Sequence, residues 1–191
     1  MGRKRGSLRR PDFDACISMI RIFFYPDSRR YVLFTESSLE HMYDHMQHWP
    51  WQKEAGGEIF SAEPDAAGLI ITAATGPNPK DRRSRHSWNP DTAAADRDRQ
   101  IEYALDRHAV GLWHTHPEAS PSPSLQDRET TGEYLKAFLG QRSRYLMVIV
   151  GNRGKPPSMT VWSCASASGA RWEALTEVPE ADYSMRQKQI R

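Results

Sequence analysis

The sequence predicts a single mixed α/β domain. Short runs rich in β-branched and aromatic residues alternate with longer segments whose apolar residues have helical spacing. The 191 residues are enough for one full hydrophobic core, and the chain contains no internal repeat and no sign of a second domain. These observations favour a mixed β-sheet flanked by helices.

Eight segments have the composition of strands, and turn residues lie between several of them. In chain order they are residues 19–25, 31–34, 57–61, 69–74, 109–114, 145–150, 159–164 and 171–175. The sequence Gly-Asn-Arg-Gly at residues 151–154 predicts the turn of a hairpin between two of them.

Three segments predict helices. Ser37 and Glu40 form a capping-box pattern at the start of the first, residues 91–108 form the second, and Ser124 has the place of an N-cap before the third. The side chains expected to face the core are, in order, Leu39, Met42, Tyr43 and Met46; Ala94, Ile101, Ala104 and Leu105; and Tyr134, Leu135, Phe138 and Leu139.

The most informative segment is W-H-T-H-P-E-A-S-P-S-P-S-L-Q-D, which ends the fifth strand and begins the third helix. Alternate residues of a strand share a face, so His114 and His116 point the same way. Pro117 ends the strand because it has no N–H for the sheet. Asp127 then lies in the first turn of the helix and can fold back. Two imidazoles and one carboxylate suit Zn²⁺ with one coordination position left open, as in catalytic sites.

Each part of this segment also has a simpler explanation. Ser124 and Asp127 have the spacing of a capping pair, and such pairs usually do nothing but start a helix. A His-x-His pair on a strand is, by itself, more often structural than metal-binding. The joint pattern favours a metal site, because independent structural features would otherwise have to coincide at one strand–loop–helix junction.

The pattern H-x-H-P-x6-S-x2-D resembles that of the JAMM zinc metalloproteases, also called JAB or MPN-plus. The resemblance extends over about residues 19–172. Family members carry a glutamate three residues before a glycine that opens an apolar strand, and Glu54 and Gly57 match these two positions. Glu58 stands where an aliphatic residue is usual and is the competing candidate. Strand alternation does not separate the two acids, since both have even numbers; the family register favours Glu54.

The resemblance implies a cytidine-deaminase-like JAMM/MPN domain with one zinc per chain, held by His114, His116 and Asp127. It implies that Glu54 is the general base and then the general acid, and that Ser124 donates a hydrogen bond to the zinc-bound water or to the oxyanion that develops. The expected reaction is cleavage after the C-terminal tail of a ubiquitin-like modifier or a similarly conjugated protein. The chain looks most like a bacterial subgroup of this family whose members are encoded beside E1-like and E2-like enzymes. Some members of the subgroup belong to antiphage operons.

Two other functions stay open at this point: a non-catalytic MPN scaffold and a small-molecule zinc amidohydrolase. Other metal or ligand sites are less favoured. His41 and His45 have helical metal-binding spacing but lack the glutamate of H-E-x-x-H. The chain has no C-x-x-C, which nucleobase deaminases require. Three tryptophans lie in strand-like runs and are expected in the core rather than on a nucleic-acid surface: Trp113, Trp162 and Trp172.

Residues 76–90 form a long basic loop. Its charges either are simply solvated or, with Trp88, clamp the substrate tail. The side chains proposed for the clamp are Arg82, Arg83, Arg85 and Trp88.

Composition and charge indicate which kinds of partner and which cellular compartment to expect. The formal net charge of +2 gives little reason to expect nucleic-acid binding, and no apolar run is long enough to span a membrane. The chain starts without the apolar region of a secretory signal, and its two cysteines suggest no disulfide framework, so a cytoplasmic protein is expected. The expected organisation is a flexible basic arm at 1–14, the JAMM-like domain at 15–178 and a solvated tail at 179–191.

Overall fold

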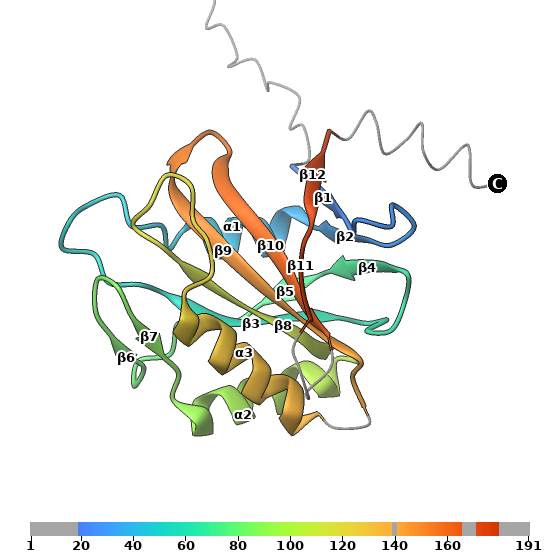
Figure 1. Ribbon diagram of the computed structural model, residues 1–191. Helices are drawn as coiled ribbons and strands as arrows, with labels where there is room; N and C mark the ends of the chain where they lie inside the picture. Colours follow the sequence, from blue (N-terminus) through green and yellow to red (C-terminus); the bar gives the residue numbers. More distant parts are fainter. Residues whose placement is uncertain (1–18, 139–140, 166–170, 180–191) are drawn as a thin grey trace, which may run out of the picture.

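The computed structural model describes residues 19–138, 141–165 and 171–179. Within them, a six-stranded sheet, a four-stranded sheet, a small hairpin and three helices form a mixed α/β fold, which confirms the predicted class (Figure 1). The predicted basic arm, the tail from residue 180 onward and Leu139 lie outside the described residues. None of the helices in the described part is both long and apolar enough to cross a membrane.

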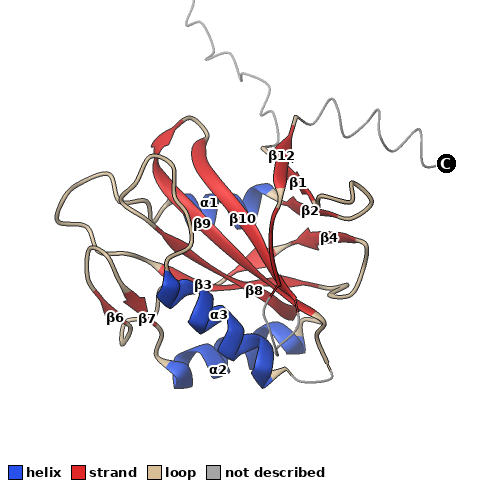
Figure 2. Ribbon diagram, in the orientation of Figure 1, coloured by secondary structure: helices blue, strands red, loops and turns tan. Residues whose placement is uncertain are grey.

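The six-stranded sheet carries the candidate site. Its strand order is β11 (Arg171–Ala174), β10 (Pro157–Ala165), β9 (Arg144–Gly154), β8 (His108–Thr115), β3 (Gly56–Ser61) and β5 (Ala73–Ala74). β8 and β9 are parallel, and the other neighbours are antiparallel. A parallel pair needs a crossover, and α3 (Leu125–Ala137) supplies it. α2 (Thr92–Ala104) lies beside α3 on the same side of the sheet (Figure 2).

The opposite side of this sheet is covered by the four-stranded sheet and by α1 (Glu36–Tyr43). The order of the second sheet is β12 (Thr176–Val178), β1 (Arg21–Phe24), β2 (Tyr31–Phe34) and β4 (Gly68–Ile71). Because β8 is covered on both sides, its residues are apolar on both faces: Trp113 belongs to the core under α1, and Leu112 to the core under α3.

Several element boundaries differ from the sequence prediction. Thr35, not Ser37, is the N-cap of α1, so the predicted capping box is wrong and Ser37 lies inside the helix. The predicted strand 69–74 is divided between β4 and β5, which belong to different sheets. β9 continues through Gly154, so the hairpin turn lies after residues 151–154. β12 had no strand-like pattern of its own and is held by its pairing with β1.

The predicted core face of α2 is correct for Ala94, which is buried, and wrong for its other three residues. Ile101 is 60% exposed and Leu105 is 58% exposed, and Ala104 is also exposed. The helix meets the sheet through the small side chains of Ala94, as predicted, and of Ala95, which was not predicted. Glu102 is buried as well, because its carboxylate pairs with the Arg107 guanidinium at 2.5 Å.

Candidate metal centre and active site

His114 and His116 lie at the C-terminal end of β8, between β3 and β9. Both side chains are buried, and the His116 backbone N–H donates to the Val150 carbonyl at 2.9 Å, which continues the pairing with β9. Strand alternation turns both imidazoles to the face that carries α3, and their Nε2 atoms are 2.9 Å apart. Thr115 points to the opposite face and is fully buried there.

Asp127 reaches the histidines because the chain turns back after Pro117. Asn152, in the segment predicted as a hairpin turn, holds the start of this loop by two hydrogen bonds. Its side-chain amide donates to the Pro117 carbonyl at 2.8 Å, and its backbone N–H donates to the Glu118 carbonyl at 2.9 Å. The loop ends at Ser124, which is the N-cap of α3.

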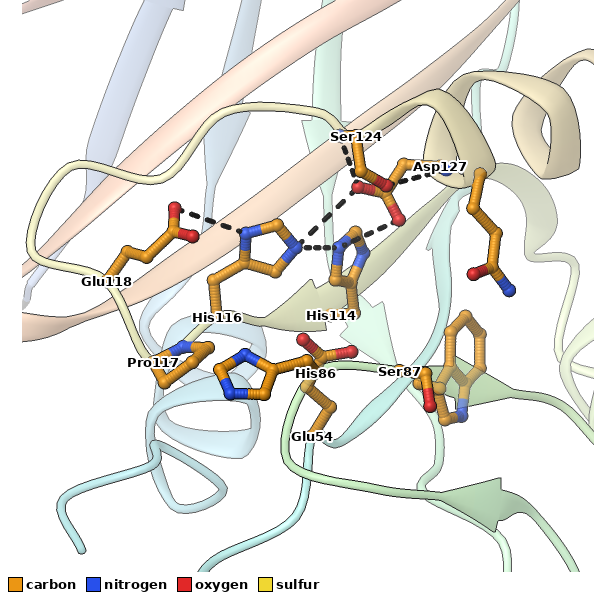
Figure 3. Close-up of a pocket in the computed structure, with 11 residues that line it drawn as sticks. Glu54, His86, Ser87, His114, His116, Pro117, Glu118, Ser124 and Asp127 are labelled. Atoms are coloured by element: carbon orange, nitrogen blue, oxygen red, sulfur yellow. Dashed lines mark hydrogen bonds and ion pairs between the residues drawn. The ribbon is translucent and has the colours of Figure 1, made fainter. Parts of the chain in front are cut away.

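The Asp127 carboxylate is both a partner in the capping box of α3 and a candidate metal ligand. Ser124 Oγ accepts a hydrogen bond from the Asp127 backbone N–H at 3.2 Å, and Asp127 Oδ2 accepts one from the Ser124 backbone N–H at 2.7 Å. This capping box turns the carboxylate toward the imidazoles: Oδ1 is 3.3 Å from His114 Nε2, and Oδ2 is 3.6 Å from His116 Nε2. Capping and metal binding are therefore compatible explanations of Asp127 (Figure 3).

The three side chains could hold a metal ion. One ligand atom from each of His114, His116 and Asp127 lies within 4.8 Å of the others. A tetrahedral ion with bonds of about 2.0–2.1 Å separates its ligands by about 3.3 Å, and the three separations between these ligand atoms, 2.9, 3.3 and 3.6 Å, fall around that value. Two ring nitrogens in contact can share only one proton, whereas a cation accepts a lone pair from each.

The charge state of Asp127 suits this role. Burial opposes its charged form, but hydrogen bonds from His114, His116 and Ser124 outweigh burial and hold the pKa of this carboxyl well below its usual range. Burial in turn lowers the pKa of His114, which favours the neutral imidazole that a metal requires.

Glu54 faces the same cavity from the neighbouring strand. Gly56 pairs with His114 in the antiparallel β3–β8 register, and the Thr115 N–H donates to the Ala55 carbonyl at 2.8 Å, which places Glu54 opposite His116. Figure 3 shows its carboxylate on the side of the histidines away from Asp127. Burial, aided by the nearby charges of Asp127 and Glu118, raises the pKa of Glu54 to about 7. Such a carboxyl group can accept and return a proton near neutral pH.

Glu58 is on the same face of β3 but further along the strand. It pairs with Leu112 and lies under α2 and α3, where one carboxylate oxygen accepts hydrogen bonds from Arg99 at 2.8 Å and from the Tyr145 hydroxyl at 3.1 Å. Burial raises the pKa of Glu58 to about 6. The structure thus brings Glu54, and not Glu58, to the histidine pair.

A cavity of about 150 Å³ opens above these groups. Besides the candidate site residues and Pro117, it is lined by His86, Ser87, Trp88, Glu118 and Gln126. Trp88 lies nearly parallel to the His114 ring, with centroids 6.4 Å apart, and Glu118 Oε2 is 3.7 Å from His116 Nδ1. Sequence reasoning singled out only Trp88 among these five, because nothing local to the others indicates a site.

Residues 82–89 form a hairpin of β6 (Arg82–Arg83) and β7 (Trp88–Asn89), not an open loop. The Arg83 guanidinium donates to the Glu54 carbonyl, and the Glu54 N–H donates to the Ser84 carbonyl at 2.7 Å. Arg85 donates to the carbonyls of Trp49 and Pro50. Arg83 and Arg85, two of the three arginines proposed to clamp the substrate tail, therefore bind the protein's own backbone. The clamp hypothesis is wrong for these two residues.

The other candidate metal pair does not form a site. His41 Nε2 is 2.6 Å from the Gly76 carbonyl oxygen, and the His45 ring stacks on Trp113 with centroids 5.9 Å apart. Trp113 is fully buried, and Trp162 and Trp172 pack against the core under α3, as expected for core residues.

Gly57 is required by a close backbone crossing. A Cβ atom at this position would lie 1.8 Å from the Thr75 carbonyl oxygen, which is itself held by the Trp113 indole N–H at 2.8 Å. We therefore expect Gly57→Ala to lower the free energy of unfolding by about 3 kcal/mol in urea denaturation. Gly132→Ala is the matched control. Gly132 lies in the middle of α3 with open space around the position of a Cβ atom, so this substitution should stabilise the folded protein by about 0.5–1 kcal/mol. Equal stability of Gly57→Ala and the unmodified protein would contradict this crossing.

Residues 35–165 match the family described as prokaryotic homologs of the JAB domain. The chain belongs to this family. The match covers most of the described residues, including both histidines, Asp127 and Glu54, and it confirms the resemblance to the JAMM proteases.

Two further comparisons found proteins similar to this chain. A protein of Pseudomonas aeruginosa (strain BWHPSA011 / Pa011) named CD-NTase/cGAS isopeptidase is 30% identical over 128 residues, which are 65% of this chain and 80% of that protein. A solution structure of a protein from Desulfitobacterium hafniense superimposes with a TM-score of 0.53 at 17% identity, covering 76% of this chain and 88% of that one. This second likeness concerns the fold alone.

Proposed function

We propose that this JAB-family protein is a zinc-dependent isopeptidase or peptidase that cleaves after the C-terminal tail of a ubiquitin-like modifier or a similarly conjugated protein. The observation that carries the proposal is the convergence of His114, His116 and Asp127 on one point, beside the buried carboxyl group of Glu54. Membership of the JAB family and the isopeptidase name of the Pseudomonas aeruginosa relative support a hydrolase of this class.

His114 and His116 would hold the ion through Nε2, and Asp127 would hold it through a carboxylate oxygen already aimed by the Ser124 cap. Zinc bound there supplies a Lewis acid that polarises a carbonyl and makes a water molecule acidic. The neutral His114 imidazole and the charged Asp127 carboxylate described above are the protonation states that this binding needs. Burial opposes the charged form of His116, but the hydrogen bond and charge of Asp127 outweigh burial and raise the pKa of His116, so a bound ion would displace a proton from that ring.

Glu54 is proposed to move the protons. Its carboxylate takes a proton from the attacking water and delivers it to the nitrogen of the leaving amine, so that no covalent intermediate with the protein is required. Ser124 Oγ already accepts the Asp127 N–H, which leaves its own O–H free to donate toward the oxygen of the carbonyl under attack.

The name of the relative suggests where to look for a substrate. By extension from that protein, we propose the C-terminal tail of a CD-NTase-type nucleotidyltransferase as the first conjugated tail to test. E1-like and E2-like enzymes encoded nearby would be the matching conjugation system. An extended tail could reach the cavity by pairing along a sheet edge, which provides affinity without much selectivity.

The test uses fusions in which the C-terminal tail of a CD-NTase, or of a ubiquitin-like protein, is joined to a reporter protein by a peptide bond or to a lysine by an isopeptide bond. Intact mass spectrometry should show one cut directly after the tail, which stops when a chelator removes zinc and resumes when zinc is restored. A folded, zinc-loaded protein that cleaves none of the fusions would favour the scaffold. Cleavage of small amides only would favour the amidohydrolase.

A further inference from the structure

Two exposed tryptophans stand beside the candidate site without a role in it. Trp49 is 57% exposed and Trp51 is 74% exposed. Their rings are parallel to within 4°, with centroids 5.4 Å apart. Single exposed apolar residues are common and need no explanation, but two adjacent stacked indoles form a continuous apolar surface. In Figure 1 the segment between α1 and β3, which carries them, extends outward from the body of the molecule.

The backbone under the two rings is held in place by hydrogen bonds. The Gln52 N–H donates to the Trp49 carbonyl at 3.1 Å, closing a turn, and the Gln52 side chain accepts from the Trp49 N–H at 2.7 Å. Arg85 adds hydrogen bonds to the carbonyls of Trp49 and Pro50, the second at 2.6 Å. An exposed turn with this many internal bonds presents its side chains in a fixed orientation.

The turn is also tied to the strand that carries the candidate ligands. The Thr115 hydroxyl, between the two histidines, lies 3.3 Å from Gln47 Oε1. The Gln47 amide then donates to the Gln52 carbonyl at 3.1 Å and to the Arg85 carbonyl at 2.8 Å. Gln47 is 1% exposed, so this connection runs through the protein interior. It fixes the tryptophan turn relative to the candidate site.

We infer that Trp49 and Trp51 form a docking surface for an apolar side chain of the substrate polypeptide, a few residues from the bond that is cleaved. This inference rests on the proposed function. Glu54 lines the cavity and follows Trp51 by three residues, and three residues span at most about 10 Å, so the backbone that carries the pair lies within that distance of the cavity wall. Lys53 lies next to the pair in the sequence and forms no ion pair with a carboxylate among the described residues. A tail with an acidic residue near the apolar one therefore fits best.

Tryptophan suits such a surface, because its large rigid ring gives much contact area while ordering only two side-chain torsions. Interfaces in which tryptophan is the anchor commonly lose about 30-fold or more in affinity when it is removed. The arrangement also explains what Arg85 does: it supports the docking turn from below instead of touching the substrate itself.

The test is a length series of tail peptides on one scissile bond, from two residues on each side to ten, compared in unmodified and Trp49→Ala/Trp51→Ala proteins. We expect the unmodified protein to gain kcat/KM with length, and the double variant to lose on the order of 10- to 100-fold on the longest peptide, mostly through KM, but less than about 3-fold on the shortest. Tyr103→Ala, which removes another exposed aromatic from α2, is the matched control and should behave as the unmodified protein.

Three results would overturn the inference. The first is an equal loss of kcat/KM on short and long peptides, which would indicate a disturbed Glu54. The second is no loss on any peptide. The third is a dimer in sedimentation velocity that the double variant abolishes, which would assign the pair to a second copy.

Binding of the longest peptide to Glu54→Gln protein, measured by calorimetry, separates this surface from the proposed function. Affinity that depends on the tryptophans supports docking even without turnover, and the absence of binding counts against it.

Discussion

Glu54→Gln protein is expected to fold and bind zinc normally but to hydrolyse its substrate about 10²–10⁴-fold more slowly. Glutamine has nearly the same shape, so the hydrogen bonds of the Glu54 backbone to Arg83 and Ser84 remain. What is lost is a side chain able to take a proton from water and return it to the leaving nitrogen. The measurement is kcat on a cleaved tail fusion, with zinc content and thermal unfolding determined on the same preparation.

The matched control is Glu58→Gln, four residues further along the chain. Its side chain is buried away from the cavity, between Arg99 and Tyr145, so turnover should change by less than about 3-fold, within the range of small positional effects. The opposite ranking of the two variants would show that the wrong carboxyl group has been chosen. A loss of zinc from Glu54→Gln would instead place Glu54 among the ligands.

Replacing both His114 and His116 by alanine is expected to remove bound zinc and all measurable hydrolysis. Each imidazole directs Nε2 to the same point, and the remaining carboxylate of Asp127 has no other candidate ligand in the group formed by the described residues. A single carboxylate does not hold zinc at micromolar concentrations in the way that three converging donors do. Metal analysis of dialysed protein is the direct measurement, and circular dichroism checks that the emptied positions leave the fold intact.

His41→Ala/His45→Ala serves as the control for nonspecific histidine loss. These rings contact the Gly76 carbonyl and Trp113 on the other side of β8, so the double variant should retain one zinc per chain. Stoichiometric zinc in the His114→Ala/His116→Ala protein, lost only when His41 and His45 are also replaced, would contradict the metal centre described above.

Much of the candidate site follows from local sequence. The two-residue period of a strand turns His114 and His116 to one face, and the capping preference of the Ser124–Asp127 pair starts a helix with the carboxylate in its first turn. Both effects operate over a few residues, so they can be recognised without a structure. The same holds for most strands of the six-stranded sheet, whose apolar runs are continuous.

Other features depend on which distant segments meet, and the sequence pattern did not reveal them. The helical spacing of Ala94, Ile101 and Leu105 predicted a core face, but Ile101 and Leu105 are exposed and α2 approaches the sheet through Ala94 and Ala95. Arg83 is part of a basic run whose contact with the Glu54 carbonyl arises only when the β6–β7 hairpin folds against residues 53–55.

The choice between Glu54 and Glu58 shows most clearly what the sequence predicts and what only the tertiary structure decides. The resemblance to the JAMM proteases predicted an acid beside the histidines and favoured Glu54, but the sequence by itself did not separate Glu54 from Glu58. Side-chain alternation repeats every two residues and is identical for both positions. Only the register between β3 and β8, which pairs Gly56 with His114 and Glu58 with Leu112, decides which carboxyl group lies opposite His116. That register is a property of two strands separated by about fifty residues of chain, and it exists only in the folded protein.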